Sequence, residues 1–436
     1  MVISFPFFLV MQDESVSVRA SSDTVNFDGV TGLSASEVEV DGKCVQVCFQ
    51  EALQKHRQGD LAGAEADYRC LLALNPDHVE TLYNLGLACY GQQRFAEAAA
   101  SYAQAATLAA EDPDIWYNLG LALKAQDNHA AAAVCYESAI ELTPDDIDCH
   151  YNLGIVLHEM HRFEEAAACF GTVLDLHPDH ASALNNLGVV YHHLERREEA
   201  VACFRRVVEL GHKPEAAEHI LAALTGTTTP APPPEYVRSL FDDFSERFDR
   251  RLLAELEYKV PEALRWMLDT LPAAPELFAN VIDLGCGTGL SGITFRDVAE
   301  RMTGVDLSTG MIEVAAKKDL YDRLATGDIK DFLAESNEVY DLFVAADVLI
   351  YLGDLTSFFA AVSGKAAPGS YLLFSTESCD AEDFVLQPSG RYAHARSYIE
   401  TLASAHGFEV ADCMTDGIRK ERGEWIMGDL FALRLP

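Results

Sequence analysis

The sequence predicts a chain of two domains, an all-α array of helical hairpins followed by an α/β domain with a mostly parallel, seven-stranded sheet. Three observations lead to this prediction. A residue pattern recurs every 34 residues between positions 45 and 214. A stretch rich in Thr and Pro, residues 225–234, has the composition of a linker. Beyond it, strand-like segments alternate with helical ones, and one strand ends in a glycine-rich turn.

Residues 1–43 lack periodicity, so we expect them to form a poorly ordered leader. The apolar stretch 3–11 is preceded by no Lys or Arg, since the first basic residue is Arg19. It therefore lacks the charged start of a signal peptide and is too short for a membrane span. The 11 cysteines include no Cys-x-x-Cys pair, which indicates a reducing compartment without a metal site. We expect a cytoplasmic protein.

The charge balance is strongly acidic, with 32 Lys and Arg against 69 Asp and Glu and a net charge of −37. Nucleic-acid binding depends on basic side chains that neutralise phosphates. We therefore expect no nucleic acid among the partners.

The repeats are defined by a Tyr-Asn-Leu-Gly sequence at 83–86, 117–120 and 151–154, with Asn-Asn-Leu-Gly at 185–188. An Ala follows each Gly after twelve residues, and an aromatic residue comes four positions later. A small residue lets two helices cross closely while the aromatic ring fills the space beside them. The predicted repeats span 45–78, 79–112, 113–146, 147–180 and 181–214, with a capping helix that extends the domain to 224.

This pattern resembles the tetratricopeptide repeat, which implies a superhelix with a concave groove. The repeats are similar to those of O-GlcNAc transferase, where an Asn ladder holds the backbone of an extended peptide. The resemblance implies a protein or peptide partner, and the acidic column Glu80, Asp114 and Asp148 favours basic side chains. The alternative is that the same side chains only cap and pack helices. The expected groove residues are Asn84, Asn118, Asn152, Asn186, Tyr83, Tyr117 and Tyr151.

In the second domain, an apolar strand at 280–284 leads into Gly285-Cys286-Gly287-Thr288-Gly289. Glycines there let the backbone approach a ligand. Asp306, 21 residues beyond Gly285, ends the next strand and can accept hydrogen bonds from ribose hydroxyls. Further strands are expected at 323–326, 340–345, 371–374, 408–413 and 430–435.

In order and spacing, residues 235–436 resemble a Rossmann-like class I methyltransferase that uses S-adenosyl-L-methionine and releases S-adenosyl-L-homocysteine. The resemblance implies that Asp328 binds the adenine amine, with Ile329 against the ring. The expected cofactor-binding residues are Asp283, Gly285, Cys286, Gly287, Gly289, Asp306, Leu307, Asp328, Ile329 and Asp347.

Segments 241–249, 347–351 and 390–394 also resemble bacterial methyltransferases predicted to carry tetratricopeptide repeats. Phe241, Phe244 and Phe248 are spaced for one helix face, which either covers the cofactor or packs on the sheet. A general base is needed only when the acceptor starts protonated. The candidates for catalysis or substrate contact are Tyr351, His394 and Tyr392.

Three functions remain open. The chain methylates a protein or peptide that the repeats recruit, or it methylates a small molecule such as an acid, a quinone or a carrier-bound acyl group while the repeats dock elsewhere. The third is a scaffold without activity, against which the intact glycine turn and Asp306 argue.

Overall fold

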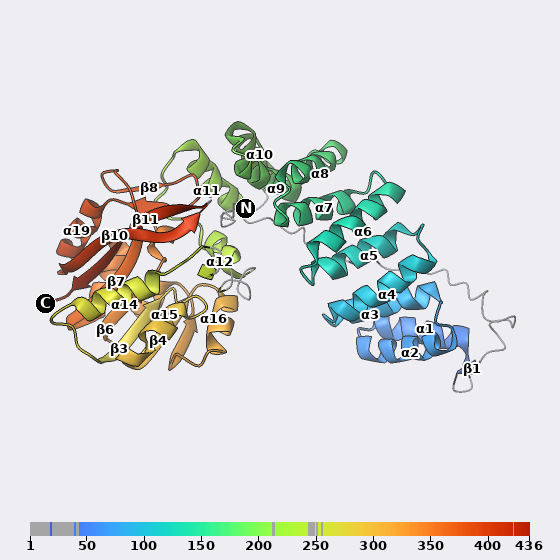
Figure 1. Ribbon diagram of the computed structural model, residues 1–436, viewed down its shortest axis with the longest axis horizontal. Coiled ribbons are helices and arrows are strands. Elements are labelled where there is room, and N and C mark those ends of the chain that lie inside the picture. Colours follow the sequence, from blue (N-terminus) through green and yellow to red (C-terminus); the bar gives the residue numbers. More distant parts are fainter. Residues whose placement is uncertain are drawn as a thin grey trace. The chain divides into compact units, whose positions relative to one another are not determined.

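The computed structural model describes residues 18–19, 39–40, 43–211, 214–242, 249, 252–253, 256–421 and 423–436 (Figure 1). Most of the expected leader lies outside the described residues. The chain divides into two compact units, one within Val10–Arg206 and the other within Val207–Pro436.

Five helical hairpins follow one another in the repeat region, as the 34-residue period predicts. A residue in the left-handed conformation follows each first helix in the turn to the second, and these residues are also 34 apart: Gly59, Gln93, Asp127, His161 and Glu195. Several helices begin with a polar N-cap residue whose side chain accepts a hydrogen bond from a backbone amide of the first turn. The Asp60 carboxylate, for example, accepts a hydrogen bond from the Gly63 amide. The helices are α1(Val45–Arg57), α2(Leu61–Leu74), α3(Val79–Gly91), α4(Phe95–Leu108), α5(Pro113–Lys124), α6(His129–Leu142), α7(Ile147–Glu159), α8(Phe163–Leu176), α9(Ala181–His193) and α10(Arg197–Leu210). Helix α11(Pro214–Thr225), which the sequence predicts as a capping helix, falls within the second compact unit.

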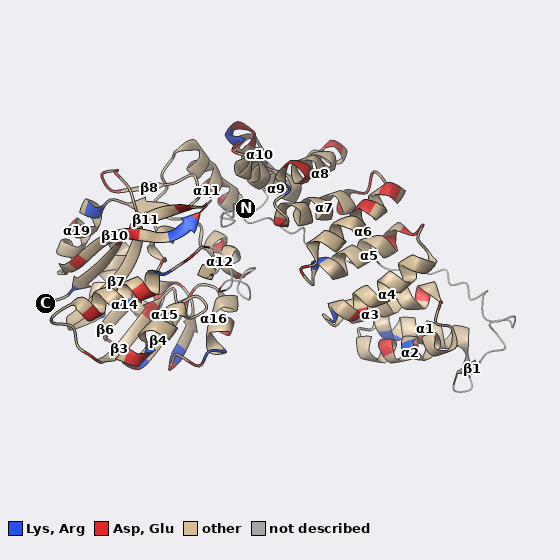
Figure 2. Ribbon diagram, in the orientation of Figure 1, with Lys and Arg blue, Asp and Glu red and all other residues tan. Residues whose placement is uncertain are grey.

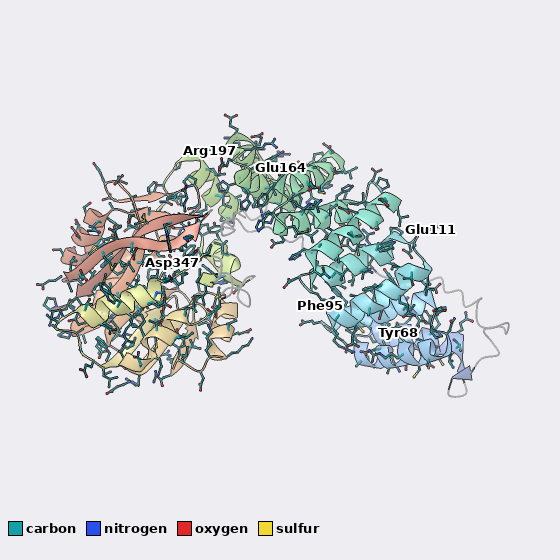
Figure 3. The ribbon with its side chains drawn as sticks, in the orientation of Figure 1. Tyr68, Phe95, Glu111, Glu164, Arg197 and Asp347 are labelled. Carbon is teal, nitrogen blue, oxygen red and sulfur yellow. The ribbon has the colours of Figure 1, made fainter. Side chains whose placement is uncertain are left out.

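The spacing of Gly and aromatic residue that recurs in each repeat has the packing role that the sequence predicts. A Cβ added to Gly86 would lie 2.5 Å from the Tyr102 ring, and one on Gly120 would lie 2.6 Å from the Tyr136 ring. Tyr68 is the equivalent buried ring of the first repeat (Figure 3). Asp and Glu occur at intervals along the helices and turns of the array (Figure 2).

The second unit is built on a mixed sheet whose main path has the order β10-β11-β7-β6-β3-β4-β5. Strands β7, β6, β3, β4 and β5 pair in parallel, while β11 is antiparallel to both β7 and β10. The predicted mostly parallel path of seven strands is confirmed. The strands are β3(Phe278–Leu284), β4(Ala299–Asp306), β5(Arg323–Thr326), β6(Tyr340–Ala345), β7(Ala366–Ser378), β10(Glu409–Glu421) and β11(Glu424–Arg434).

Two apolar cores lie on opposite faces of this sheet because successive strand residues point to opposite sides. On β3, Val281 belongs to the core beneath α14, while Ile282 belongs to the core that contains Phe358 of α18 and Ile399 of α19. The helical elements of this unit are α12(Pro234–Asp242), α14(Val260–Thr270), α15(Leu290–Phe295), η1(Arg296–Val298), α16(Thr309–Ala316), α17(Ile329–Glu335), η2(Leu349–Tyr351), α18(Thr356–Ser363) and α19(Arg396–Ala405).

The structure adds two short strands that the sequence did not predict. Strand β9(Tyr392–His394) pairs in parallel with the end of β7 and antiparallel with β8(Phe384–Leu386). They extend the sheet beyond the carboxyl end of β7. The residues expected as a linker also pack on this unit, since Pro230 O accepts the Asp354 amide at 2.8 Å. A further short pair, β1(Glu39–Val40) and β2(Lys43–Cys44), precedes the repeats.

Candidate active site

The turn after β3 requires glycine at three positions. Gly285, Gly287 and Gly289 have φ angles of 71°, 51° and 94°, in the left-handed region that side chains disfavour. A Cβ on Gly285 would lie 2.5 Å from Val348 Cγ2. A Cβ on Gly287 would meet nothing within 4 Å, because this glycine borders a cavity. The turn therefore brings bare backbone to the cavity wall.

Asp306, at the end of β4, holds this turn in place. One carboxylate oxygen accepts the Gly287 amide at 2.8 Å and the other accepts the Ser308 amide at 2.9 Å. Burial raises the pKa of Asp306, while these hydrogen bonds act in the opposite direction. A carboxylate has about four lone-pair sites, so Asp306 can still accept bonds from a ligand.

Asp283 lies behind the turn rather than on the cavity. It is fully buried, and its Oδ2 accepts a hydrogen bond from Tyr321 at 2.7 Å. Burial raises the pKa of Asp283 to about 7, against the hydrogen bond from Tyr321. The same burial raises the pKa of the neighbouring Cys286 thiol, which stays protonated at neutral pH.

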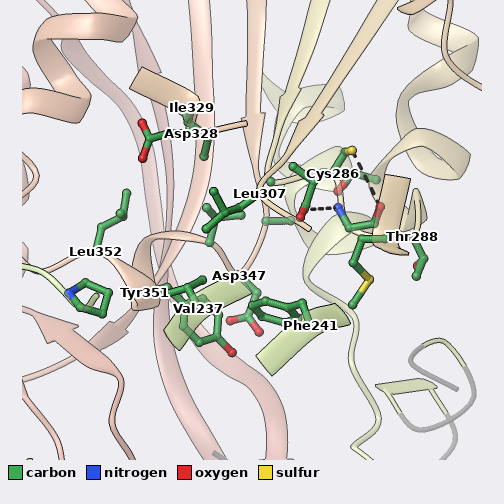
Figure 4. Close-up of a pocket in the computed structure, with 18 of the residues that line it drawn as sticks. Val237, Phe241, Cys286, Thr288, Leu307, Asp328, Ile329, Asp347, Tyr351 and Leu352 are labelled. Carbon is green, nitrogen blue, oxygen red and sulfur yellow. Dashed lines mark hydrogen bonds between the residues drawn. The ribbon is translucent and has the colours of Figure 1, made fainter. Parts of the chain in front are cut away.

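A cavity of about 340 Å³ opens at the carboxyl ends of the parallel strands (Figure 4). Nine of the predicted site residues line it: Gly285, Cys286, Gly287, Asp306, Leu307, Asp328, Ile329, Asp347 and Tyr351. Asp283 and Gly289 support the turn from outside the lining. Most of the cofactor-binding residues expected from the sequence are thus gathered around one space.

His394 and Tyr392, the other two catalytic candidates, lie in β9 and outside this lining. Both are fully buried. The His394 ring lies 2.9 Å from Gly353 O through Nε2, and burial lowers the pKa of His394 to about 4. The Tyr392 hydroxyl bonds the Thr229 hydroxyl at 2.7 Å. The structure therefore places these two side chains in the packing around the cavity.

Two buried arginines on the cavity wall have no counterpart among the residues expected from the sequence. Arg419 is 1% exposed; it contacts Asp347 at 2.6 Å, Glu421 at 3.0 Å, and Glu377. Arg391, 2% exposed, contacts Glu377 at 2.7 Å and Glu421 at 2.6 Å. Arg391 lies in a segment that the sequence analysis noted, whereas Arg419 lies in a polar stretch that gave no indication of burial.

This network contacts Asp347, which lies just beyond the end of β6 (Figure 3). Its φ angle is 60°, which is uncommon for a residue with a side chain. Its amide donates to Ser375 Oγ at 2.9 Å, and its carboxylate is bound by Arg419. These contacts offset the backbone strain and aim Asp347 at the cavity.

The chain before β3 covers part of the cavity. Pro232, Val237 and Phe241 line it, and the Phe241 ring packs edge-on against Tyr351 at 5.2 Å between centroids. This position fits the predicted cover for Phe241, whereas Phe244 and Phe248 lie outside the described residues. The linker composition of residues 225–234 did not predict that some of these residues form a cavity wall.

The expected groove residues of the repeats are buried in the other unit. All four Asn side chains bond within the array: Asn84 Nδ2 donates to Glu80 O at 2.7 Å, Asn118 Nδ2 to the Tyr83 hydroxyl at 2.8 Å, Asn152 Nδ2 to Asp148 O at 2.9 Å, and Asn186 Nδ2 to the Tyr151 hydroxyl at 3.1 Å. Asn118 differs from them, because it also contacts the backbone of Arg19.

Within the second unit, a parallel sheet, a glycine turn after its first strand and a cavity at the strand ends define a Rossmann-like domain of the class I methyltransferase type. Comparison with known proteins agrees. A family model described as methyltransferase domain matches residues 253–411, and models described as tetratricopeptide or TPR repeat match 49–113, 125–161 and 146–213. The chain thus joins tetratricopeptide repeats to a methyltransferase domain, as predicted.

Two curated relatives illustrate the likeness of this domain. A ubiquinone biosynthesis O-methyltransferase of Thiobacillus denitrificans is 28% identical over 135 residues, which cover 30% of this chain and 56% of the relative. A malonyl-[acyl-carrier protein] O-methyltransferase of Serratia marcescens is 29% identical over 123 residues, which cover 28% of this chain and 46% of the relative. The chain spans about half the length of these relatives.

Solved structures also resemble part of this chain. A crystal structure of MamA is 28% identical and covers 37% of this chain and 95% of its own, with a TM-score of 0.36. A structure of YrrB, titled a TPR protein with an unusual peptide-binding site, is 25% identical and covers 39% of this chain and 89% of its own, with a TM-score of 0.38.

In the part of the chain that the structure describes, no helix combines the length and apolar character needed to cross a bilayer.

Proposed function

We propose that this protein is an S-adenosyl-L-methionine-dependent methyltransferase and that the cavity at the strand ends holds the cofactor. The observation that carries the proposal is the space beside Gly287, where a Cβ would meet nothing within 4 Å and the backbone is open to a ligand. The bound cofactor would supply an electrophilic methyl group on its sulfonium.

The lining residues fit the parts of this cofactor. Asp306 would accept the ribose hydroxyls, Asp328 the adenine amine, and Leu307 and Ile329 would contact the adenine ring. Asp328 already accepts the Lys330 amide at 2.8 Å, which fixes the direction of its carboxylate. The turn at Gly285–Gly287 would lie against the methionyl end.

The protein's part in the reaction is alignment and exclusion of water, since the methyl group is already activated. Phe241 and Tyr351 close one side of the cavity with packed rings. The buried network of Arg419, Asp347 and Glu377 would keep the wall beside Tyr351 rigid.

We further propose that the acceptor is an oxygen that is already anionic, as in a carboxylate. The described lining contains no histidine. Burial raises the pKa of Tyr351 and of Tyr258, so both phenols stay protonated at neutral pH and are poor bases. The Asp347 carboxylate is already engaged by Arg419 at 2.6 Å. The two relatives above are both named as O-methyltransferases.

The repeats would recruit a polypeptide that carries or presents this acceptor. A small molecule, such as an acid, a quinone or a carrier-bound acyl group, is the second candidate substrate, favoured by the names of the relatives.

The first test is calorimetric titration of the full chain with S-adenosylhomocysteine. Asp306→Asn should weaken binding at least about tenfold, or about 1.4 kcal/mol. Asp380→Asn, at an exposed acid outside the cavity, should leave binding unchanged and controls for the charge. Absence of binding by the wild-type chain would refute the proposal.

The second test follows labelled methyl groups from the cofactor into a cell lysate of the source, fractionated by size. A carboxyl ester releases volatile methanol in mild alkali, while methylated nitrogen and methyl ethers do not. Alkali-labile label in a protein band supports both parts of the proposal. Label confined to small molecules makes a small molecule the substrate, and alkali-stable label contradicts the carboxylate acceptor.

A further inference from the structure

The repeat groove contains a residue of the chain's own leader. Asn118 holds the backbone of Arg19 at both of its polar groups: the Arg19 amide donates to Asn118 Oδ1 at 2.9 Å, and Asn118 Nδ2 donates to Arg19 O at 3.1 Å. The Tyr83 hydroxyl donates to the same carbonyl at 2.8 Å. Val18, the preceding residue, packs against the apolar cores of the array. This is how an extended peptide is held irrespective of its side chains.

The Arg19 side chain is bound by an aromatic ring and three carboxylates. Its guanidinium lies 4.0 Å above the centre of the Tyr117 ring. One terminal nitrogen lies 2.9 Å from Asp114, and the other lies 2.7 Å from Asp146 and 3.6 Å from Asp148. The side chain is 21% exposed, so solvent screens these charges only in part.

This set of contacts distinguishes arginine from other residues. A planar guanidinium can stack on a ring and donate sideways to two carboxylates at once, whereas the point charge of lysine cannot do both. The three acids belong to α5, to α7 and to the Asp146 cap before α7, so two adjacent repeats build one position. The set carries more negative charge than Arg19 balances.

We propose that the groove is a recognition site for an arginine within an extended polypeptide, and that Arg19 occupies it in cis. A partner would enter by placing its own arginine over Tyr117 and displacing the leader. This inference rests on the proposed role of the repeats in recruiting a polypeptide. It identifies an arginine side chain as the feature of that polypeptide that the repeats recognise.

Occupation in cis makes the groove a competitive switch. A tethered segment competes at an effective concentration on the order of millimolar. For a partner peptide that binds with a Kd on the order of 10 μM, Arg19 would reduce apparent affinity by roughly 10- to 100-fold. Removal of Arg19 should recover that factor.

The test measures fluorescence anisotropy of a labelled synthetic peptide with the sequence of residues 12–26, titrated with the full chain. We compare the wild type with Arg19→Ala, and the peptide with versions that carry Lys or Ala at the arginine. Asp114→Asn with Asp146→Asn in the Arg19→Ala chain removes two acids, and Asn retains the capping function of Asp146. Asp175→Asn, at an exposed acid of α8, is the charge control.

The Arg19→Ala chain should bind the peptide about 10- to 100-fold more tightly than the wild type. Relative to the Arg19→Ala chain with the Arg peptide, affinity should fall at least about tenfold in the double Asp variant, and likewise with the Ala peptide. The Lys peptide should bind more weakly than the Arg peptide. Asp175→Asn should leave the affinity unchanged. Equal binding by wild type and Arg19→Ala, or equal binding of the Arg and Ala peptides, would overturn the proposal.

Light scattering on the same samples identifies the source of the occupant. A monomeric wild type supports occupation in cis. A dimer that dissociates in Arg19→Ala shows instead that a second copy fills the groove and overturns the cis arrangement. Titration with S-adenosylhomocysteine is independent of the groove, so failure of this inference is distinguishable from failure of the methyltransferase assignment.

Discussion

Two neighbouring glycines separate the role of the turn in folding from its role in binding. Gly285→Ala and Gly287→Ala both place a methyl group on a left-handed residue, which costs about 1–2 kcal/mol. Lower entropy of the unfolded chain offsets about 0.4–1 kcal/mol of that cost. At Gly285 the methyl group also meets Val348 at 2.5 Å, an overpacking that adds about 1–3 kcal/mol.

Gly287→Ala should therefore destabilise the domain by about 1 kcal/mol, and Gly285→Ala by about 2–4 kcal/mol. For cofactor affinity in the folded chain, the larger effect is expected from Gly287→Ala. The methyl group of Gly287→Ala would project into the open space where we place the cofactor, so its affinity for S-adenosylhomocysteine should fall about 100-fold in a chain that remains folded.

Differential scanning calorimetry of the full chain measures the first effect, and titration calorimetry measures the second. The transition of the methyltransferase domain is the one that ligand shifts to higher temperature. Wild-type affinity in Gly287→Ala would refute the location of the cofactor beside this turn. Equal stability of the two variants would show that Val348 moves aside without cost.

Three further predictions follow from buried groups. Gly120→Ala should destabilise the array by about 1–2 kcal/mol through the Tyr136 ring, whereas Gly171→Ala, with nothing within 4 Å in the middle of α8, should stabilise it by about 1 kcal/mol; similar transition temperatures would contradict the packing argument. The pKa of Asp283 in the folded chain is about 7, above its ordinary 3.8. The protonated side chain therefore adds to the free energy of unfolding at low pH, and this contribution is lost as the pH rises through 7. Between about pH 5 and about pH 8.5, the free energy of unfolding of Asp283→Asn, measured with urea, should rise by about 2–3 kcal/mol relative to that of the wild type. A difference that stays constant with pH would disprove the raised pKa. Because the pKa of His394 is lowered to about 4, His394→Gln should leave the pH profile of methyl transfer unchanged above about pH 5; loss of a limb near the ordinary pKa of 6.5 would give His394 a catalytic role.

The features that depend on local periodicity could be predicted from the amino-acid sequence. The 34-residue spacing of Gly120 and Tyr136 with their equivalents specifies helix crossings, because only a small residue admits the ring that follows. The glycines at 285 and 287 specify a left-handed turn for the same kind of reason. These features are encoded within a few residues or one repeat, so pattern and spacing were sufficient to predict them.

Which polar residues contact one another could be seen only in the folded chain. Arg419 and Asp347 are 72 residues apart and pair only because β10 folds back toward the end of β6 through β11 and β7. Arg19 and Asp146 are 127 residues apart and meet only because the superhelix presents α5 and α7 side by side to the leader. His394 looked as suitable for catalysis as Tyr351 in the sequence, yet pairing of β9 with β7 buries it outside the cavity. Charge and hydrogen-bonding capacity are properties of single residues, but their use depends on burial and on partners that the chain brings together from afar.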